Sequence, residues 1–230
     1  MPSPRYLIAA ALLLWPLTYP AQVRAQSQTD RAEQAEFVEL AKSPGTLQIP
    51  GLTIIYLSPL GNPAAAPWKN IILHQTEGPA GAAAALAKAQ AAHPTKRGVT
   101  IWVETDGTAY WSVPETAIPT HGDGANRNDH KYTDNSKTYR TVVKTNSIGI
   151  EFVGNYPDVR KPPTPEQFAA CLVLVRFLQA RYGIPIERVY AHNWIDFKDA
   201  RYCEGCELAQ RVRAAAGLAS PRSASDSARR

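Results

Sequence analysis

Residues 164–192 read TPEQFAACLVLVRFLQARYGIPIERVYAH, and this stretch indicates the fold class. Thr164 begins it as a helix N-cap, since a proline follows at the first helical position and Gln167 completes a capping box. An apolar segment then runs to Tyr182 and stops at Gly183, a residue typical of helix ends. The stretch therefore predicts a long helix, followed by a strand that leads into the final histidine.

The segments before this helix have the character of strands. Asp106-Gly107 lies between two apolar runs and is a strong hairpin signal. Together with the strand after the helix, the expected strands cover 70–74, 100–105, 108–113, 147–153 and 188–191. An alanine-rich segment over 81–92 predicts a further helix. Strands that alternate with helices indicate a single α/β domain with a central mixed β-sheet flanked by helices.

Composition and charge limit the function classes. The chain has 230 residues, of which 44% are hydrophobic and 20% charged, so one globular domain is expected and whole-chain disorder is excluded. Most of the net charge of +5 lies at the ends of the chain, in Arg5, Arg24 and a further +2 over 219–230. The central part is nearly neutral, which gives no support for a nucleic-acid partner.

The first 25 residues have the pattern of a secretory signal peptide. Arg5 precedes an apolar run from Leu7 to Leu17, and Val23-Arg24-Ala25 offers small residues at the positions that a signal peptidase reads. The run is about half of the roughly 20 residues that a membrane-spanning helix needs. We therefore expect export to the periplasm or the extracellular space, with no transmembrane segment after cleavage.

The remaining chain divides by composition. We expect an N-terminal arm over 26–46, the domain over 47–218 and a disordered tail over 219–230, which is rich in Ala, Ser and Arg. No internal repeat is present. We expect the protein to be a monomer.

Five histidines and three cysteines are the candidates for metal binding. No two histidines have the i, i+4 spacing of a zinc-binding helix, so the fold must assemble any metal site from separate segments. His74 and His192 each follow a predicted strand, which is where α/β proteins present ligands.

The cysteines allow more than one interpretation. Cys203-Glu-Gly-Cys206 is a C-x-x-C pair, and the third cysteine is Cys171. A four-cysteine structural zinc site is excluded because only three cysteines exist. An odd number in an exported protein leaves one thiol outside any disulfide, and a metal can hold such a thiol as a thiolate. A nucleophilic cysteine with a histidine base remains an alternative.

Glu151 is the candidate general base. It shares one face of the predicted strand 147–153 with Gly149 and Val153. A desolvated carboxylate on that face could take up a proton during a reaction, whereas the same residue on an edge strand would face water. The strand pattern leaves both interpretations open.

These segments, taken in order, resemble the zinc-dependent N-acetylmuramoyl-L-alanine amidase family, which also contains phage amidase-lysozymes and peptidoglycan recognition proteins. Each segment alone is a weak match, but together they are specific because they keep the family's order. The matching segments are Ile71–Gly78, Asp106–Thr108, His121-Gly122, Asn146–Glu151, the helix over 164–182, Ala191-His192 and Arg201–Gly205.

The resemblance implies a catalytic zinc site. It makes His74, His192 and Cys203 the ligands of a zinc cofactor, with a fourth position left open, as in catalytic sites. It makes Glu151 the catalytic base and gives Arg201 the role of supporting the oxyanion.

The resemblance also implies the substrate and the reaction. His121 and Thr76 become substrate-binding residues in a cleft that accepts peptidoglycan or a muropeptide. The implied reaction is hydrolysis of the amide bond between the lactyl group of N-acetylmuramic acid and L-alanine. The alternative is a peptidoglycan-binding module without catalysis, as in relatives that lack the third ligand.

The sequence departs from the family pattern at three places. Arg201 stands where lysine is usual, and Lys198 is an alternative for its role. Val99 stands where part of the family has a catalytic tyrosine. The segment before Cys203 is longer than in many members. Asp196, Asp199 and Cys206 are therefore competing candidates for the third ligand.

Two cysteines, Cys171 and Cys206, are left over under this ligand assignment. The signal-like pattern of the first 25 residues places the protein outside the cytoplasm, where disulfides form and persist. We therefore expect a disulfide between them.

Overall fold

The computed structural model of the protein describes residues 44–197 and 201–218. The expected signal peptide, nearly all of the expected arm and the expected tail lie outside these residues, as do Lys198 and Asp199. Among the helices of the described part, none has both the length and the apolar character required to cross a membrane.

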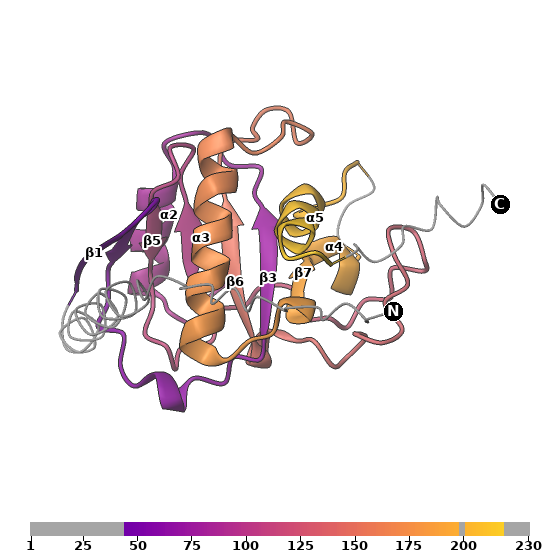
Figure 1. Cartoon of the computed structure of the whole chain (residues 1–230), viewed down its shortest axis with the longest axis horizontal. Helices are drawn as coiled ribbons and strands as arrows, with labels where there is room; N and C mark the ends of the chain where they lie inside the picture. Colours follow the sequence, from indigo (N-terminus) through magenta and orange to yellow (C-terminus); the bar gives the residue numbers. More distant parts are fainter. Residues whose placement is uncertain (1–43, 198–200, 219–230) are drawn as a thin grey trace, which may run out of the picture. The chain divides into compact units, whose positions relative to one another are not determined.

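Seven strands form one sheet in the order β1-β2-β5-β4-β6-β3-β7 (Figure 1). The strands are β1 Gly45–Ile49, β2 Leu52–Tyr56, β3 Asn70–Gln75, β4 Ile101–Val103, β5 Ala109–Trp111, β6 Ser147–Phe152 and β7 Val189–Ala191. β4, β6, β3 and β7 pair in parallel, whereas the hairpin pairs β1–β2 and β4–β5 are antiparallel. The sheet is therefore mixed, as the sequence predicts.

Helices cover the sheet. They are α2 Ala83–Ala92, α3 Pro165–Tyr182, α4 His192–Ile195 and α5 Cys206–Ala215, with 3-10 turns η1 Pro63–Ala65, η2 Lys144–Asn146 and η3 Ile186–Arg188. Figure 1 shows α3 lying along the sheet, and α5 packs against α3, β3 and β7. α2 packs against the β4–β5 hairpin. The predicted α/β domain with flanking helices is confirmed.

The central strands are buried along their whole length. All six residues of β3 and all six of β6 are buried, which is typical of parallel strands that are covered on both faces. β6 lies between β4 and β3. An edge-strand position for Glu151, with its side chain facing water, is therefore wrong.

Two parts of the fold differ from the sequence expectations. β1 begins at Gly45, inside the stretch assigned to the arm, and the β1–β2 hairpin was not predicted. Helix α5 was not predicted either. Its buried residues are Cys206, Leu208, Ala209 and Val212.

The start of α3 has the capping geometry that the sequence predicts. The hydroxyl oxygen of Thr164 accepts the N–H of Gln167 at 3.0 Å, and the Gln167 side chain accepts the N–H of Thr164 at 3.0 Å. The Thr164 hydroxyl also donates to the carbonyl of Thr105 at 2.6 Å. Gly183 ends the helix in the left-handed region with φ 66°. The cap thus joins α3 to the β4–β5 hairpin.

We expect Thr164→Ala to lower the free energy of unfolding by about 1–2 kcal/mol, because the cap and the bond to Thr105 are lost together. Urea denaturation followed by circular dichroism measures this change. Thr145→Ala is the matched control, since Thr145 is exposed in η2 and should change stability by less than about 0.5 kcal/mol. Equal losses in the two variants would contradict the capping role.

Candidate active site

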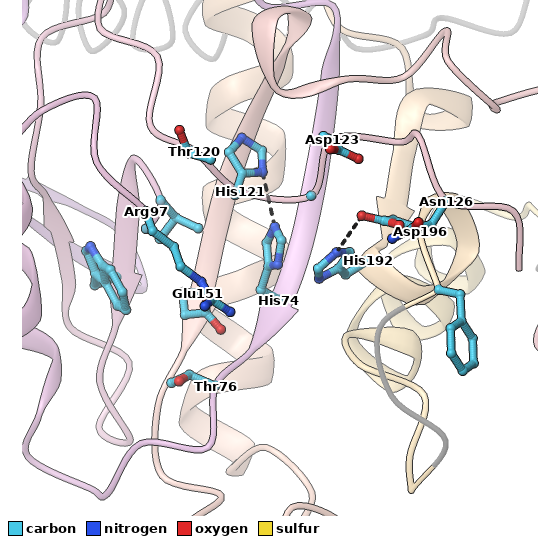
Figure 2. A pocket seen from close by; sticks show the side chains of 15 residues that line it. His74, Thr76, Arg97, Thr120, His121, Asp123, Asn126, Glu151, His192 and Asp196 are labelled. Atoms are coloured by element: carbon cyan, nitrogen blue, oxygen red, sulfur yellow. Dashed lines mark hydrogen bonds and ion pairs between the residues drawn. The ribbon is translucent and has the colours of Figure 1, made fainter.

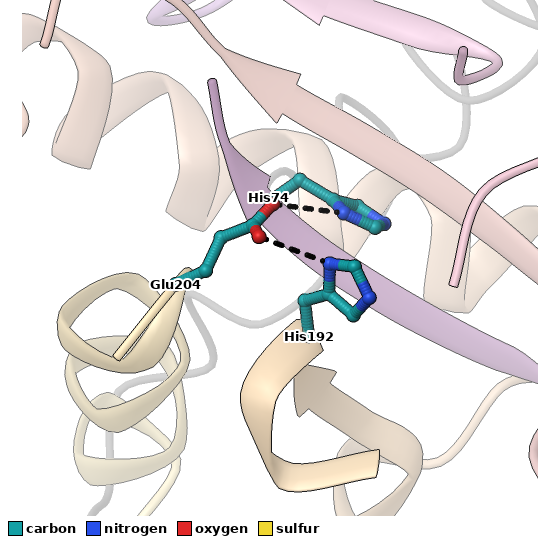
Figure 3. A group of neighbouring side chains, drawn as sticks. All are labelled: His74, His192 and Glu204. Carbon is teal, nitrogen blue, oxygen red and sulfur yellow. Dashed lines mark hydrogen bonds and ion pairs between the residues drawn. The ribbon is translucent and has the colours of Figure 1, made fainter. Parts of the chain in front are cut away.

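His74, His192 and Glu204 come together at one edge of the sheet. His74 lies near the end of β3, His192 follows β7 and Glu204 lies just before α5. One donor atom from each lies within 4.8 Å of the others, and all three residues are buried. Figure 3 shows the Glu204 carboxylate facing both imidazole rings. Two imidazole nitrogens and a carboxylate oxygen form a donor set that zinc uses in catalytic sites.

Glu204 faces the same nitrogen on both histidines. Its Oε1 lies 3.3 Å from Nδ1 of His74, and its Oε2 lies 3.1 Å from Nδ1 of His192. Burial by itself would raise the pKa of the Glu204 carboxyl, but His192 and His74 lower it well below its usual range. The carboxyl is therefore ionised, as a metal ligand must be.

A chain of hydrogen bonds behind His74 determines the protonation of two rings (Figure 2). The Ser147 carbonyl can only accept, so Nε2 of His121, 3.1 Å away, is the donor. Burial, reinforced by the neighbouring His74, lowers the pKa of His121 to about 3. His121 is therefore neutral, and its Nδ1 accepts a hydrogen bond from Nε2 of His74 at 3.2 Å.

The hydrogen bonds from Ser147 through His121 to His74 bear on whether the site fits a metal ion. The Nε2–H of His74 donates a hydrogen bond to His121. A neutral His74 therefore carries its lone pair on Nδ1, the atom that faces the Glu204 carboxylate. Two acceptors at that separation repel each other. His74 satisfies both neighbours only by carrying a second proton or by binding a cation through Nδ1. A divalent metal ion bound by His74, His192 and Glu204 is the second of these two states, so the donor set is compatible with a metal.

His192 has an outer partner as well. Its Nε2 lies 3.7 Å from Oδ2 of Asp196, a buried carboxylate four residues further along the chain. Each histidine thus directs Nδ1 toward Glu204 and Nε2 toward an outer residue. Such outer partners orient the rings of metal-binding histidines and increase their basicity.

Glu151 lies beside His74 because of the strand register. β3 and β6 are parallel neighbours, and His74 and Glu151 are directly paired positions. Paired positions on adjacent strands direct their side chains to the same face of the sheet. Glu151 is only 8% exposed, yet it reaches the same cavity as His74.

A cavity of about 670 Å³ opens over these residues. This volume is typical of a site that binds a small molecule or a fragment of a polymer. The residues that line it include His74, Thr76, Arg97, Trp102, Thr120, His121, Asp123, Asn126, Glu151, His192, Asp196 and Phe197. Glu204 is fully buried beneath the two histidines.

Three glycines make room for the site. A Cβ atom at Gly122 would lie 2.7 Å from Nε2 of His192, and one at Gly149 would lie 3.0 Å from Nδ1 of His121. A Cβ at Gly205 would overlap the backbone carbonyl of Leu73. The last glycine therefore lets the loop before α5 lie directly on β3, and this close approach brings Glu204 to His74.

The structure corrects the predicted third ligand. Cys203 is joined to Cys206 in a disulfide, so neither sulfur is a thiolate that could bind a metal. Glu204, the neighbour of Cys203, reaches the histidines instead. The same disulfide removes the thiol that a nucleophilic Cys203 with His192 as its base would need. Asp196 lies on the outer side of His192, which leaves the third position to Glu204.

The predicted disulfide between Cys171 and Cys206 is wrong. Cys171 is a free cysteine inside α3, and burial raises the pKa of its thiol. The short C-x-x-C spacing brings Cys203 within a Cα–Cα distance of 5.5 Å of Cys206, and these two residues pair locally.

The remaining predicted residues have mixed outcomes. Thr76 and His121 line the cavity, and His121 also bonds to His74. The Arg201 side chain is 55% exposed, forms an ion pair with Glu77 and does not line the cavity. The predicted support of an oxyanion by Arg201 therefore has no geometric basis here. Arg97 lines the cavity, although no sequence pattern points to it.

A sequence profile of one protein family matches most of the domain. The profile of the Amidase_2 family, described as N-acetylmuramoyl-L-alanine amidase, matches residues 64–206, which is more than half of the chain. The chain belongs to this amidase family. The matched residues contain both histidines, Glu151 and Glu204, so the site described above is the candidate active site of an amidase. None of the curated proteins compared with the chain matches it.

Distant structural likenesses exist as well. N-acetylmuramoyl-L-alanine amidase LysC from Clostridium intestinale is 18% identical with a TM-score of 0.49, over 72% of this chain and 97% of its own. The catalytic domain of XlyA is 25% identical with a TM-score of 0.43, over 63% and 87%. The Ph2119 endolysin from a Thermus scotoductus bacteriophage is 21% identical with a TM-score of 0.41, over 64% and 86%. Family membership rests on the sequence profile.

We expect Gly205→Ala to lower the free energy of unfolding by about 3 kcal/mol, because it combines left-handed backbone strain with overlap on β3. Gly183→Ala is the matched control: its φ of 66° is close to the 76° of Gly205, but no atom lies within 4 Å of its added Cβ. Thermal and urea denaturation measure both. Similar losses in the two variants would contradict the close approach of the Gly205 loop to β3.

Proposed function

We propose that this protein is a zinc-dependent hydrolase that cleaves the amide bond between the lactyl group of N-acetylmuramic acid and L-alanine. Its substrate would be peptidoglycan or a soluble muropeptide. The observation that carries the proposal is the placement of Glu151 beside His74 in a cavity, with a complete set of metal donors beneath it. Membership of the amidase family supports the same reaction.

The proposed zinc ligands are His74, His192 and Glu204. All three donors are buried and the carboxyl is ionised. The hydrogen bond from His74 to His121 and the close Asp196 carboxylate beside His192 orient the rings. When bound, zinc supplies a Lewis acid that polarises the scissile carbonyl and lowers the pKa of water to about 7. A catalytic zinc site has three protein ligands and one open position, and His74 and His192 both line the cavity.

Glu151 is the proposed general base. Its carboxylate accepts a proton from the attacking water and returns it to the nitrogen of the leaving L-alanine. Burial between β4 and β3 keeps bulk water from competing for that proton. Val99 stands near the cavity in place of a tyrosine, so Glu151 is the group in this part of the site that can transfer protons.

Thr76 and His121 are the proposed substrate-binding residues, and His121 has a second task. Because both its ring nitrogens are engaged with Ser147 and His74, it acts mainly by positioning His74. Thr76 directly follows β3 and lines the cavity, where its hydroxyl can contact a substrate.

Export fits this activity, because peptidoglycan lies outside the cytoplasmic membrane. The signal-like pattern of the first 25 residues supports a periplasmic or extracellular location. A disulfide between Cys203 and Cys206 is also typical of an oxidising compartment.

Incubation with a purified muramoyl peptide tests the function. We expect release of a free alanine amino group, loss of activity after EDTA treatment and recovery on addition of zinc. Amino-group labelling and mass spectrometry identify the products. Cleavage of glycan bonds instead, or binding to peptidoglycan without any product, would refute the proposal and favour a glycosidase or a binding module.

Replacement of the base tests its role separately. We expect Glu151→Gln to lower kcat by about 10²–10⁴-fold while zinc content is unchanged, because the amide keeps the shape but cannot take up the proton. Glu166→Gln is the control, since Glu166 is exposed in the first turn of α3. An active Glu151→Gln variant would remove Glu151 from the mechanism.

The third ligand has a test of its own. We expect Glu204→Gln to weaken zinc binding by more than about 100-fold, since loss of outer partners alone costs 10–100-fold. Cys203→Ser should retain zinc. Competition with a chromogenic chelator measures both, with Glu207→Gln as the control because that nearby carboxylate is on the surface. The reverse result, zinc lost only in Cys203→Ser, would restore the ligand predicted from the sequence.

A further inference from the structure

The three proposed zinc ligands come from three separate elements of the fold. Figure 3 shows His74 on β3, His192 at the start of α4 and Glu204 on the segment just before α5. A metal site binds tightly only when its donor atoms are held close to the geometry that the metal prefers. The groups that fix the spacing of these three elements therefore contribute to the site, even where they do not contact the metal.

Tyr202 joins the segment that carries Glu204 to strand β3. It lies two residues before Glu204, and its hydroxyl donates to the carbonyl of Gln75 at 3.0 Å. Gln75 directly follows His74 and is the last residue of β3. Tyr202 is half-buried and does not line the cavity. Its hydrogen bond therefore connects the main chain beside one ligand with the segment that carries another.

Asn193 joins the same segment to α4. It directly follows His192 in the chain and is fully buried. Its side-chain amide donates to the carbonyl of Tyr202 at 3.0 Å, and its main-chain N–H donates to the carbonyl of Glu204 at 3.4 Å. Its own carbonyl accepts the side-chain amide of Asn128 at 3.4 Å. A helix of 4 residues has little stability of its own, so the position of α4 depends on such bonds to other segments.

We propose that Tyr202 and Asn193 are positioning residues of the zinc site, which hold its three ligands in place before the metal binds. This inference rests on the proposed function and adds two residues that do not line the cavity. Two hydrogen bonds in series, from the Tyr202 hydroxyl to Gln75 and from Asn193 to the Tyr202 carbonyl, connect all three ligand segments. Both bonds end on main-chain carbonyls, so neither involves a donor atom of a ligand. A donor set that is already in place loses less conformational freedom on binding, which raises affinity.

Removal of the Tyr202 hydroxyl tests the first bond. We expect Tyr202→Phe to weaken zinc binding by about tenfold, since loss of an outer partner typically costs 10–100-fold and this one acts through the main chain. Competition with a chromogenic chelator measures the zinc affinity. Urea denaturation of the zinc-free proteins measures stability separately.

Tyr182→Phe is the matched control. Tyr182 is also half-buried, and its hydroxyl donates to Oε1 of Glu115 at 2.7 Å. It is the last residue of α3, and neither it nor Glu115 lines the cavity. Each tyrosine variant thus loses one hydroxyl and one hydrogen bond. We expect Tyr182→Phe to lower stability and to leave the zinc affinity unchanged.

A second pair of variants repeats the comparison at Asn193. We expect Asn193→Ala to weaken zinc binding by at least about tenfold, because α4 and the Glu204 segment lose their side-chain connection. Asn155→Ala is its control, since Asn155 is also buried but its side-chain amide donates within its own loop, to the Val159 carbonyl at 3.4 Å. If Asn193→Ala fails to fold, Tyr202→Phe alone decides, because it removes a single oxygen atom.

The zinc affinities of the two tyrosine variants decide the inference. Zinc binding at least about threefold weaker in Tyr202→Phe than in Tyr182→Phe would support it. A smaller difference, including equal losses in both variants, would overturn it and leave the proposed function standing, because the Tyr202 bond would then serve stability alone. A wild type that binds no zinc would refute the proposed zinc chemistry and this inference with it.

Discussion

The carbonyl oxygen of Ser147 can only accept a hydrogen bond, and this constraint passes through two imidazole rings. It makes His121 a donor through Nε2 and an acceptor through Nδ1, so His74 in turn donates through Nε2. The remaining nitrogen of His74 is the one that faces Glu204. Ser147 is the first residue of β6, the strand that also carries Glu151. One strand therefore determines both the protonation of a proposed ligand and the position of the proposed base.

Polar groups as buried as these are costly unless each has a partner, because a buried charge without one loses its hydration. In this amidase the buried polar groups lie together at one edge of the sheet, and apolar residues pack around them. Leu73 and Ile150, which precede His74 and Glu151, are fully buried and paired across β3 and β6. The glycines at 122, 149 and 205 let the rings and the Glu204 loop approach without gaps. Stability of the sheet and geometry of the site therefore depend on the same contacts.

The sequence predicts those parts of the molecule that local patterns determine. The α3 cap, the Asp106-Gly107 hairpin and the strands that carry His74 and Glu151 all follow from short-range chemistry. Glu204 could not be found this way, because its selection over Cys203 depends on a left-handed glycine against a distant strand and on the pairing of Cys203 with Cys206. Arg97 was missed for the same reason. Its place in the cavity depends on Thr120, which is far from it in sequence.

The proposed ligands are widely separated along the chain, and this has a consequence for when the enzyme can act. His74 is synthesised first, Glu151 and His192 follow, and Glu204 comes late, just before the last described helix. The partners of His74 are therefore present only after almost the whole domain has been made. A partly synthesised chain therefore has an incomplete donor set. The linear order of the residues thus delays assembly of the candidate site until synthesis of the domain is nearly complete.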